Sequence, residues 1–283
     1  MEWLAWFGYV VASILGGLVL LWGVGGYYHI KYYVLRRDRP ETWKCQPRRF
    51  LRPDQQRQAM WLSSMNLCIG GLLSGTMIYG LSRGMPTPIY FDVDEYGWFY
   101  TLFSTALLFV LVDGLAYYAH RFLHIKALFP HIHRWHHRYI ATTPFVVTAM
   151  HPAEFILFQA TTFIPLFLLP VHYISAITIF IYILVFNIID HSGIKLSSRW
   201  PWQGPVEYHD DHHVYFHVNF GQCLQIWDRF HGTLRRVDRR YGIDVFGGKG
   251  KSAEGFDSGV HSGVHSGVHS GSRAAKPRFV VYK

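Results

Sequence analysis

FILFQATTFIPLFLLPVHYISAITIFIYILVFNII, residues 155–189, contains no Asp, Glu, Lys or Arg. One membrane crossing by a helix needs roughly 20 apolar residues, so this stretch is long enough to cross twice. Pro170, Val171 and His172 lie near its middle, and a proline interrupts or kinks a helix. The stretch therefore predicts a helical hairpin that turns near these three residues, with Pro165 kinking its first arm.

Three further apolar runs precede the hairpin, at residues 3–28, 60–81 and 98–119. Half of the chain is hydrophobic and only 16% is charged, which is more apolar than an ordinary soluble domain. The first run has no basic residue before it and is longer than the apolar core of a signal peptide, so we expect it to remain as an anchor. These features predict an all-α, polytopic membrane protein with about four to five transmembrane helices.

The charges predict how the helices are oriented in the membrane. Residues 31–57 contain nine basic and three acidic side chains, whereas residues 82–97 contain Arg83 alone against three acidic side chains. By the positive-inside rule, the first loop is cytoplasmic and the second is not. A hairpin at 155–189 then returns the rest of the chain to the cytoplasm, whereas a single crossing would place it on the other side. The net charge of +9 is explained by topology and by anionic lipid headgroups rather than by nucleic acid.

Three short histidine motifs lie on the predicted cytoplasmic face. They are HRFLH (120–124), HRWHH (133–137) and HDDHH (209–213), and we call them histidine boxes. On a helix, residues three and four apart share one face, so each box would direct its imidazoles at one place. Together they supply His120, His124, His133, His136, His137, His209, His212 and His213. That set exceeds the ligands of one zinc site and predicts two metal ions in a cytoplasmic, histidine-rich helical cap. Imidazole suits iron, copper or zinc, and not magnesium or calcium.

Four other residues extend the candidate site. Asp190 directly precedes His191 at the end of the hairpin, where a carboxylate can orient a ligand through its outer ring nitrogen. Asp113 lies two helical turns before the first box, and an ionisable group inside a membrane is a candidate functional residue. Asp113 and Asp190 are therefore candidate catalytic residues in supporting roles. His151 could supply a further metal ligand, and the two aspartates of the third box either support its histidines or are solvated.

These motifs resemble the sterol desaturase and fatty acid hydroxylase superfamily of membrane di-iron enzymes, over roughly residues 113–233. HRFLH, HRWHH and EYHDDHH look like its three histidine boxes. HPAE (151–154), DHSG (190–193) and NFGQCLQIWDRFHGT (219–233) look like segments of its C-4 methylsterol oxidase and cholesterol 25-hydroxylase branches.

The resemblance implies oxygen activation at two irons and oxidation or hydroxylation of a lipid C–H bond, with a sterol as the expected lipid. It implies electrons from NAD(P)H through a cytochrome b-type protein and its reductase, and an endoplasmic reticulum location, although the chain ends in VVYK without a dilysine signal.

Desaturation on the same metal site is the alternative activity, and transport of a metal is a further alternative. Zinc binds such ligands more tightly than iron and could replace it in purified protein. The implied iron ligands are His120, His124, His133, His136, His137, His191, His209, His212 and His213.

The chain divides into three expected parts. Residues 1–97 form an N-terminal anchor of transmembrane helices and loops, and residues 98–240 form the catalytic domain. Residues 241–283 form a tail that contains SGVH repeats at 258–271. The repeats have no apolar periodicity that could bury a core, so we expect the tail to be disordered.

Overall fold

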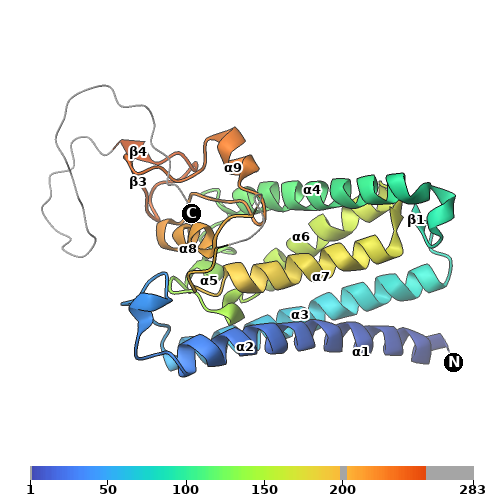
Figure 1. Ribbon diagram of the computed structural model, residues 1–283, viewed down its shortest axis with the longest axis horizontal. Coiled ribbons are helices and arrows are strands. Elements are labelled where there is room, and N and C mark those ends of the chain that lie inside the picture. Colours follow the sequence, from blue (N-terminus) through green and yellow to red (C-terminus); the bar gives the residue numbers. More distant parts are fainter. Residues whose placement is uncertain (1, 198–202, 253–283) are drawn as a thin grey trace, which may run out of the picture.

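A computed structural model describes residues 2–197 and 203–252 of the chain. Within these two ranges, four helices are long and apolar enough to cross a membrane: Glu2–Val34, Pro53–Ser82, Gly97–Leu123 and Tyr173–Asp190. A shorter apolar helix covers Pro152–Phe167. These helices lie lengthwise along the molecule (Figure 1). The all-α class with four to five membrane helices is confirmed.

The helices follow the predicted apolar runs. α1 (Glu2–Leu20) continues through two π-helical stretches, η1 (Leu21–Gly25) and η2 (His29–Val34), with α2 (Gly26–Tyr28) between them. The other long helices are α3 (Pro53–Ser82), α4 (Gly97–Leu123), α6 (Pro152–Phe163) and α7 (Tyr173–Asp190). The short helices are α5 (Arg134–His137), α8 (Val206–Tyr215) and α9 (Ile226–His231), and single turns form η3 (Pro40–Thr42), η4 (Val93–Glu95), η5 (Pro144–Val146) and η6 (Ile164–Phe167).

The predicted hairpin is present and turns where the prolines are. α6 gives way to the tighter turn η6 at Pro165, and α7 begins just after strand β2 (Val171–His172). β2 pairs in parallel with β1 (Ile89–Tyr90), with Ile89 opposite Val171. This pairing ties the hairpin turn to the loop between α3 and α4. The first arm is shorter than the four long helices because Pro165 ends its regular part.

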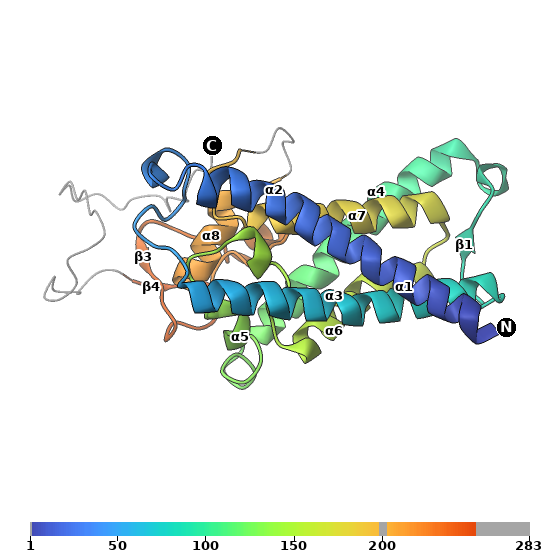
Figure 2. The same ribbon diagram turned by 90° about the horizontal axis from the view of Figure 1, so that it is seen from below.

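α1 and α3 cross at unusually close range because α3 has glycines at the crossing. A Cβ atom on Gly75 would lie 2.4 Å from the Cα atom of Val10, and one on Gly71 would lie 2.5 Å from Cγ1 of Ile14. Small residues of this kind let membrane helices approach to backbone contact. Figure 2 shows α1 running diagonally across α3 at this crossing.

The hairpin and the long helices bring three helix ends together. The C-terminal ends of α4 and α7 and the N-terminal end of α6 lie at the end of the bundle that carries α5 and α8 (Figure 1). Leu21, Phe145 and Ile188 are buried together there and join η1, η5 and α7. The structure therefore places all three boxes at one end of the molecule.

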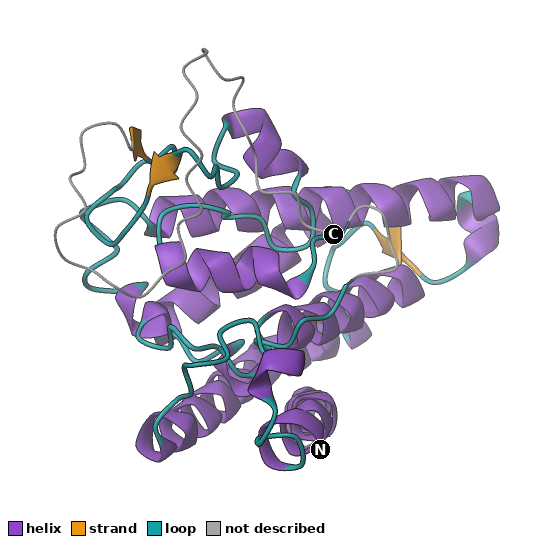
Figure 3. Cartoon of the chain, turned by 60° about the vertical axis from the view of Figure 1, so that its left-hand side comes forward, coloured by secondary structure: helices purple, strands orange, loops and turns teal. Residues whose placement is uncertain are grey.

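The part of the chain after α9 forms a small irregular cap. β3 (Arg239–Arg240) pairs antiparallel with β4 (Lys251–Ser252), and Figure 3 shows that strands are confined to such short pairs. Val245 is buried, and the ring of Phe246 lies 4.0 Å from that of His217. Residues 241–252, at the start of the tail expected to be disordered, thus pack against the segment that follows α8, while the SGVH repeats lie outside the described residues.

Candidate metal centre

Each histidine box sits at a helix end or on a short helix at the same end of the bundle. In the first box, His120 lies in the last turn of α4 and His124 caps that helix. The second box begins at the N-cap of α5, and the third lies within α8. His191 caps the C-terminal end of α7. All nine of these histidines are buried.

The nine imidazoles separate into two groups. Within each group, the nitrogen atoms that could bind a metal all lie within 4.8 Å of one another. Group A contains His120, His124, His133, His137 and His212, and group B contains His136, His191, His209 and His213. The arrangement is compatible with a metal centre, and its division into two matches the number of ions that the boxes predict.

The HxxHH spacing explains how the second and third boxes each serve both groups, whereas both histidines of the first box belong to group A. Successive residues on a helix point about 100° apart, whereas residues four apart share a face. His133 and His137 accordingly join group A, and His136 joins group B. The third box is reversed, because His209 and His213 join group B while the intervening His212 joins group A. The adjacent histidine pairs therefore link the two groups.

Hydrogen bonds on the outer ring nitrogens orient most of group A. Nδ1 of His120 lies 2.8 Å from the carbonyl oxygen of Phe220, and Nδ1 of His212 lies 2.7 Å from that of Val218. A carbonyl only accepts, so these Nδ1 atoms carry the proton and leave Nε2 as the ligand atom. Nδ1 of His124 lies 2.9 Å from Nδ1 of His217.

The inward-facing nitrogens fit a metal ion. The Nε2 atoms of His191 and His209 lie 2.9 Å apart, and those of His120 and His133 lie 3.1 Å apart. Among the described residues, Nε2 of His124, His137, His212 and His213 has no hydrogen-bond partner. Buried polar atoms without partners are rare, and imidazole nitrogen is a common ligand of iron, copper and zinc.

The electrostatic environment keeps these ligands neutral. The pKa lies well below the usual 6.5 for His124, His133, His136, His137, His209, His212 and His213. Burial is the main cause, because it disfavours the charged imidazolium, and neighbouring imidazoles add repulsion. A neutral imidazole is the form that binds a metal, so the ligands are available at neutral pH.

The two predicted catalytic aspartates make different contacts. Asp190 Oδ1 lies 2.6 Å from Nδ1 of His191 and accepts a hydrogen bond from it. Asp113 accepts hydrogen bonds of 2.8 Å from the backbone N–H of Cys223 and from Nε1 of Trp227. Asp190 thus touches a member of group B, whereas Asp113 holds the segment between α8 and α9. Their roles in catalysis remain predictions.

His151 lies outside both groups. It is the N-cap of α6, where its Nδ1 accepts a 3.1 Å hydrogen bond from the backbone N–H of Ala153. Its ring packs against Trp135, with 4.7 Å between ring centroids. The structure therefore gives His151 a capping contact, and its role as a metal ligand stays a prediction.

Sequence reasoning missed three supporting residues. Glu154 is fully buried, and its Oε1 lies 2.6 Å from Nδ1 of His133. His217 belongs to none of the three boxes, and its Nδ1 lies against Nδ1 of His124. Asp228 accepts hydrogen bonds from the backbone N–H groups of Phe220 and Gly221. Glu154 lies in HPAE and Asp228 in NFGQCLQIWDRFHGT. Their presence in these two family-like segments is the sequence feature that could have pointed to them.

The aspartates of the third box are both paired. Asp210 is buried and accepts hydrogen bonds of 3.0 Å from Nε2 of Gln46 and from Oγ1 of Thr142. Burial raises the pKa of Asp210 to about 6, against these hydrogen bonds. Asp211 forms a 3.0 Å ion pair with Arg235. The basic loop before α3 is therefore attached to the helix that carries the third box.

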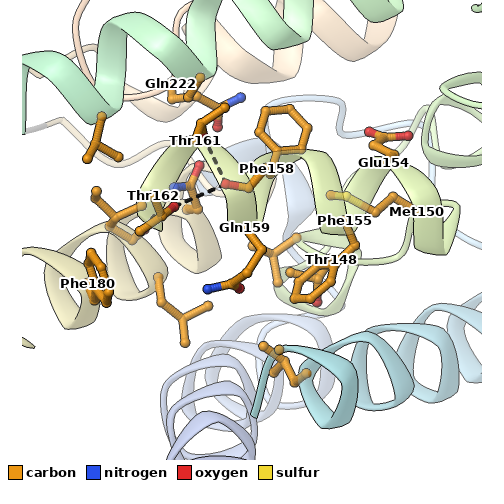
Figure 4. Close-up of a pocket in the computed structure, with 18 of the residues that line it drawn as sticks. Thr148, Met150, Glu154, Phe155, Phe158, Gln159, Thr161, Thr162, Phe180 and Gln222 are labelled. Carbon is orange, nitrogen blue, oxygen red and sulfur yellow. Dashed lines mark hydrogen bonds between the residues drawn. The ribbon is translucent and has the colours of Figure 1, made fainter. Parts of the chain in front are cut away.

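A cavity of about 240 Å³ leads from the histidines into the apolar part of the bundle. His120, His136 and His191 line one end of it. Its walls come from α1, α3, α4, α6 and α7 and are mostly apolar (Figure 4). A molecule in this cavity would contact both histidine groups and the interior of the helix bundle.

The sequence is similar to one protein family and to several known sterol enzymes. Residues 105–233 match the fatty acid hydroxylase family. The chain is 30% identical over 153 residues to the Delta(7)-sterol 5(6)-desaturase erg31 of Schizosaccharomyces pombe, covering 54% of this chain and 51% of that protein. It is 32% identical over 152 residues to the Delta(7)-sterol 5(6)-desaturase of Candida glabrata, covering 53% and 42%. It is 30% identical over 151 residues to the lathosterol oxidase of Rattus norvegicus, covering 52% and 50%.

The matches cover part of each relative. The chain spans about half the length of the curated relatives it matches. By their names, these relatives belong to neither of the two branches that the motifs resemble. No solved structure matches the chain.

Proposed function

We propose an activity from one premise, which is that this chain belongs, through residues 105–233, to the sterol desaturase and fatty acid hydroxylase superfamily. The proposed activity is oxidation of a C–H bond in a membrane lipid with O₂ and electrons from NAD(P)H. The proposed lipid is a sterol. The observation that carries the proposal is the pair of buried imidazole groups at one end of an apolar cavity.

The histidines of groups A and B would hold two iron ions. Protein side chains do not by themselves oxidise an unactivated C–H bond, and bound iron would supply the oxygen chemistry. Affinity alone does not select iron over zinc, so zinc is expected to bind the same ligands in purified protein and to leave it inactive.

The chain's own residues orient the ligands and exclude water. Asp190 and Glu154 accept hydrogen bonds from the Nδ1 atoms of His191 and His133, which directs each Nε2 lone pair inward. The boxes are buried, so bulk water has no direct access to them. A lipid could enter the cavity from the bilayer and bring one carbon to the histidines.

The proposed location is the endoplasmic reticulum membrane, with the histidines on the cytoplasmic side. The basic loop at residues 31–57 supports this orientation because Gln46 contacts α8 at the histidine end of the bundle. A cytochrome b-type donor and its NAD(P)H reductase would then reach the same side.

The names of the relatives favour one specific outcome, which is desaturation of the lipid. Two of them are named sterol 5(6)-desaturases and one a lathosterol oxidase. Desaturation removes a second hydrogen from the neighbouring carbon, whereas hydroxylation inserts oxygen. A metal transporter is disfavoured, because the histidines form two compact groups at one end of the bundle rather than a path across it.

A product assay tests the proposal. Membranes that contain the full chain receive lathosterol, NADH or NADPH and air, and their sterols are analysed by mass spectrometry. We expect a product two mass units lighter for desaturation or sixteen units heavier for hydroxylation. The same membranes with His212→Ala should give neither. If wild type and variant give identical sterol profiles for lathosterol and for the cells' own lipids, the proposed activity is wrong.

A further inference from the structure

Gln159 places an amide group inside the apolar cavity. It lies on α6 among the rings of Phe155, Phe158 and Phe180, and Figure 4 shows its side chain projecting into the cavity. The same cavity is also lined by histidines of both groups, among them His120 and His136. Gln159 is five residues after Glu154, which corresponds to about 8 Å along the helix axis.

The Gln159 amide makes no hydrogen bond in the part of the chain that the structure describes. The neighbouring polar groups on α6 are already satisfied, since Oγ1 of Thr161 and of Thr162 each donate to the carbonyl oxygen of Phe158, at 2.8 and 3.1 Å. An amide in an apolar, membrane-embedded cavity is unfavourable unless it finds a partner. A polar group on the molecule that fills the cavity would supply that partner.

The backbone of α3 keeps the amide in place. A Cβ atom on Gly70 would lie 3.3 Å from Oε1 of Gln159 and 2.9 Å from the ring of Phe155. The glycine therefore lets both side chains lie against α3. The small residues Gly71 and Ser74 continue this wall, which leaves a smooth surface suited to a rigid ring system.

We propose that Gln159 hydrogen-bonds the hydroxyl group of the lipid substrate and so determines which carbon faces the histidine groups. The inference rests on the proposed function, because it assigns a specificity residue to the same cavity. The amide can donate to and accept from a hydroxyl. With the hydroxyl fixed at Gln159, a rigid fused-ring lipid would present a carbon one or two rings away to groups A and B.

Binding measurements on the full chain in lipid nanodiscs test this role without requiring activity. Radiolabelled lathosterol and the same sterol without its hydroxyl, cholest-7-ene, are compared. Wild type should bind lathosterol about tenfold more tightly, the effect of one hydrogen bond. Gln159→Leu and Gln159→Met, which retain the volume, should bind the two sterols equally. Gln58→Leu is the matched control, since Gln58 contacts Tyr139 outside the cavity and its variant should keep the preference.

The outcomes separate this inference from the proposed function. Equal binding of both sterols by wild type, no binding of either, or a preference that survives in both Gln159 variants would overturn it. If the same preparations oxidise lathosterol without showing the preference, only the role of Gln159 is wrong. If the preference is present and depends on Gln159 while the product assay in membranes detects no oxidised sterol, the role of Gln159 stands and the proposed activity is wrong.

Discussion

Glu154 Oε1 lies 2.6 Å from Nδ1 of His133, and both residues are buried. Because the carboxylate accepts this hydrogen bond, it fixes the proton of His133 on Nδ1 and leaves Nε2 facing group A. Oε2 of Glu154 has no partner among the described residues. The position of Glu154 therefore depends mainly on His133, and the orientation of His133 depends on Glu154.

We expect Glu154→Gln to weaken metal binding by about ten- to a hundredfold, the usual effect of losing a carboxylate behind a ligand. A glutamine amide can present its N–H₂ group to His133 and favour the wrong tautomer. Metal content after dialysis against a graded chelator series measures the effect. Glu207→Gln, on the first turn of α8, is the control and should retain metal. Equal retention by both variants would remove Glu154 from its assigned role.

The two adjacent histidines of the third box should have separable effects. His212 belongs to group A and His213 to group B. We expect His212→Ala and His213→Ala each to lower the metal content by about one ion per chain, since each removes a ligand from a different site. Elemental analysis of the purified variants provides the count. A loss of all metal in either single variant would show that the two groups act as one site.

Acidification should destabilise the metal-free protein. Burial lowers the pKa of seven box histidines well below 6.5, whereas in the unfolded chain they titrate near 6.5. The unfolded state therefore binds more protons as the pH falls through 6.5, and stability decreases with falling pH. Burial raises the pKa of Asp210 to about 6 and also raises the pKa of Glu207 and of Asp228. These three carboxyl groups act in the opposite direction as the pH falls through their raised pKa values, and the seven histidines outnumber them.

The melting temperature of chelator-treated protein, measured from pH 8 to pH 5.5, checks this expectation. It should be nearly constant above pH 7.5 and should fall steadily below 6.5. A melting temperature that is flat or rises on acidification would mean that the histidines are not held neutral by burial.

Asp228 should be important for stability. It accepts hydrogen bonds from the backbone N–H groups of Phe220 and Gly221 and from the hydroxyl groups of Tyr208 and Thr233. Asp228→Asn removes the charge that strengthens these bonds and should cost about 2 kcal/mol, or roughly 4–8 °C in melting temperature for a chain of this size. Tyr208→Phe removes one of these bonds and should cost less. An Asp228→Asn protein as stable as wild type would contradict this reading.

Much of the fold could be predicted because it depends on local patterns. The length of residues 155–189 and the prolines inside them gave the hairpin and its turn, and the apolar runs gave the long helices. The close crossing of α1 and α3 could not be predicted in the same way. In the sequence, Gly71 and Gly75 are small residues within an apolar helix. Their contacts, Ile14 and Val10, are distant in the chain, so no local pattern pairs them.

The candidate site was predictable to the level of the boxes. The HxxHH spacing indicates a shared face, but the division into groups A and B depends on how α4, α5, α7 and α8 meet in space. Glu154 was not singled out, because an acidic residue in the first turn of a helix is ordinarily explained by the helix dipole. His217 was likewise one histidine among many, and only its position against His124 distinguishes it.

The glycine crossing gives a final prediction with an internal control. Gly75→Leu would place side-chain atoms where the backbone of Val10 lies, since even a Cβ atom would be 2.4 Å from its Cα atom. α1 must then move away from α3, at a cost of about 1–3 kcal/mol or more. Gly8→Leu, on the outer face of α1, is the control, because a Cβ atom there meets nothing within 4 Å.

The same crossing also shapes the cavity, because Gly17 of α1 lines it. The Gly75 variant should therefore lose sterol binding as well as thermal stability, whereas the Gly8 variant should lose neither. Equal melting temperatures for the two variants would show that the close crossing does not contribute to the fold.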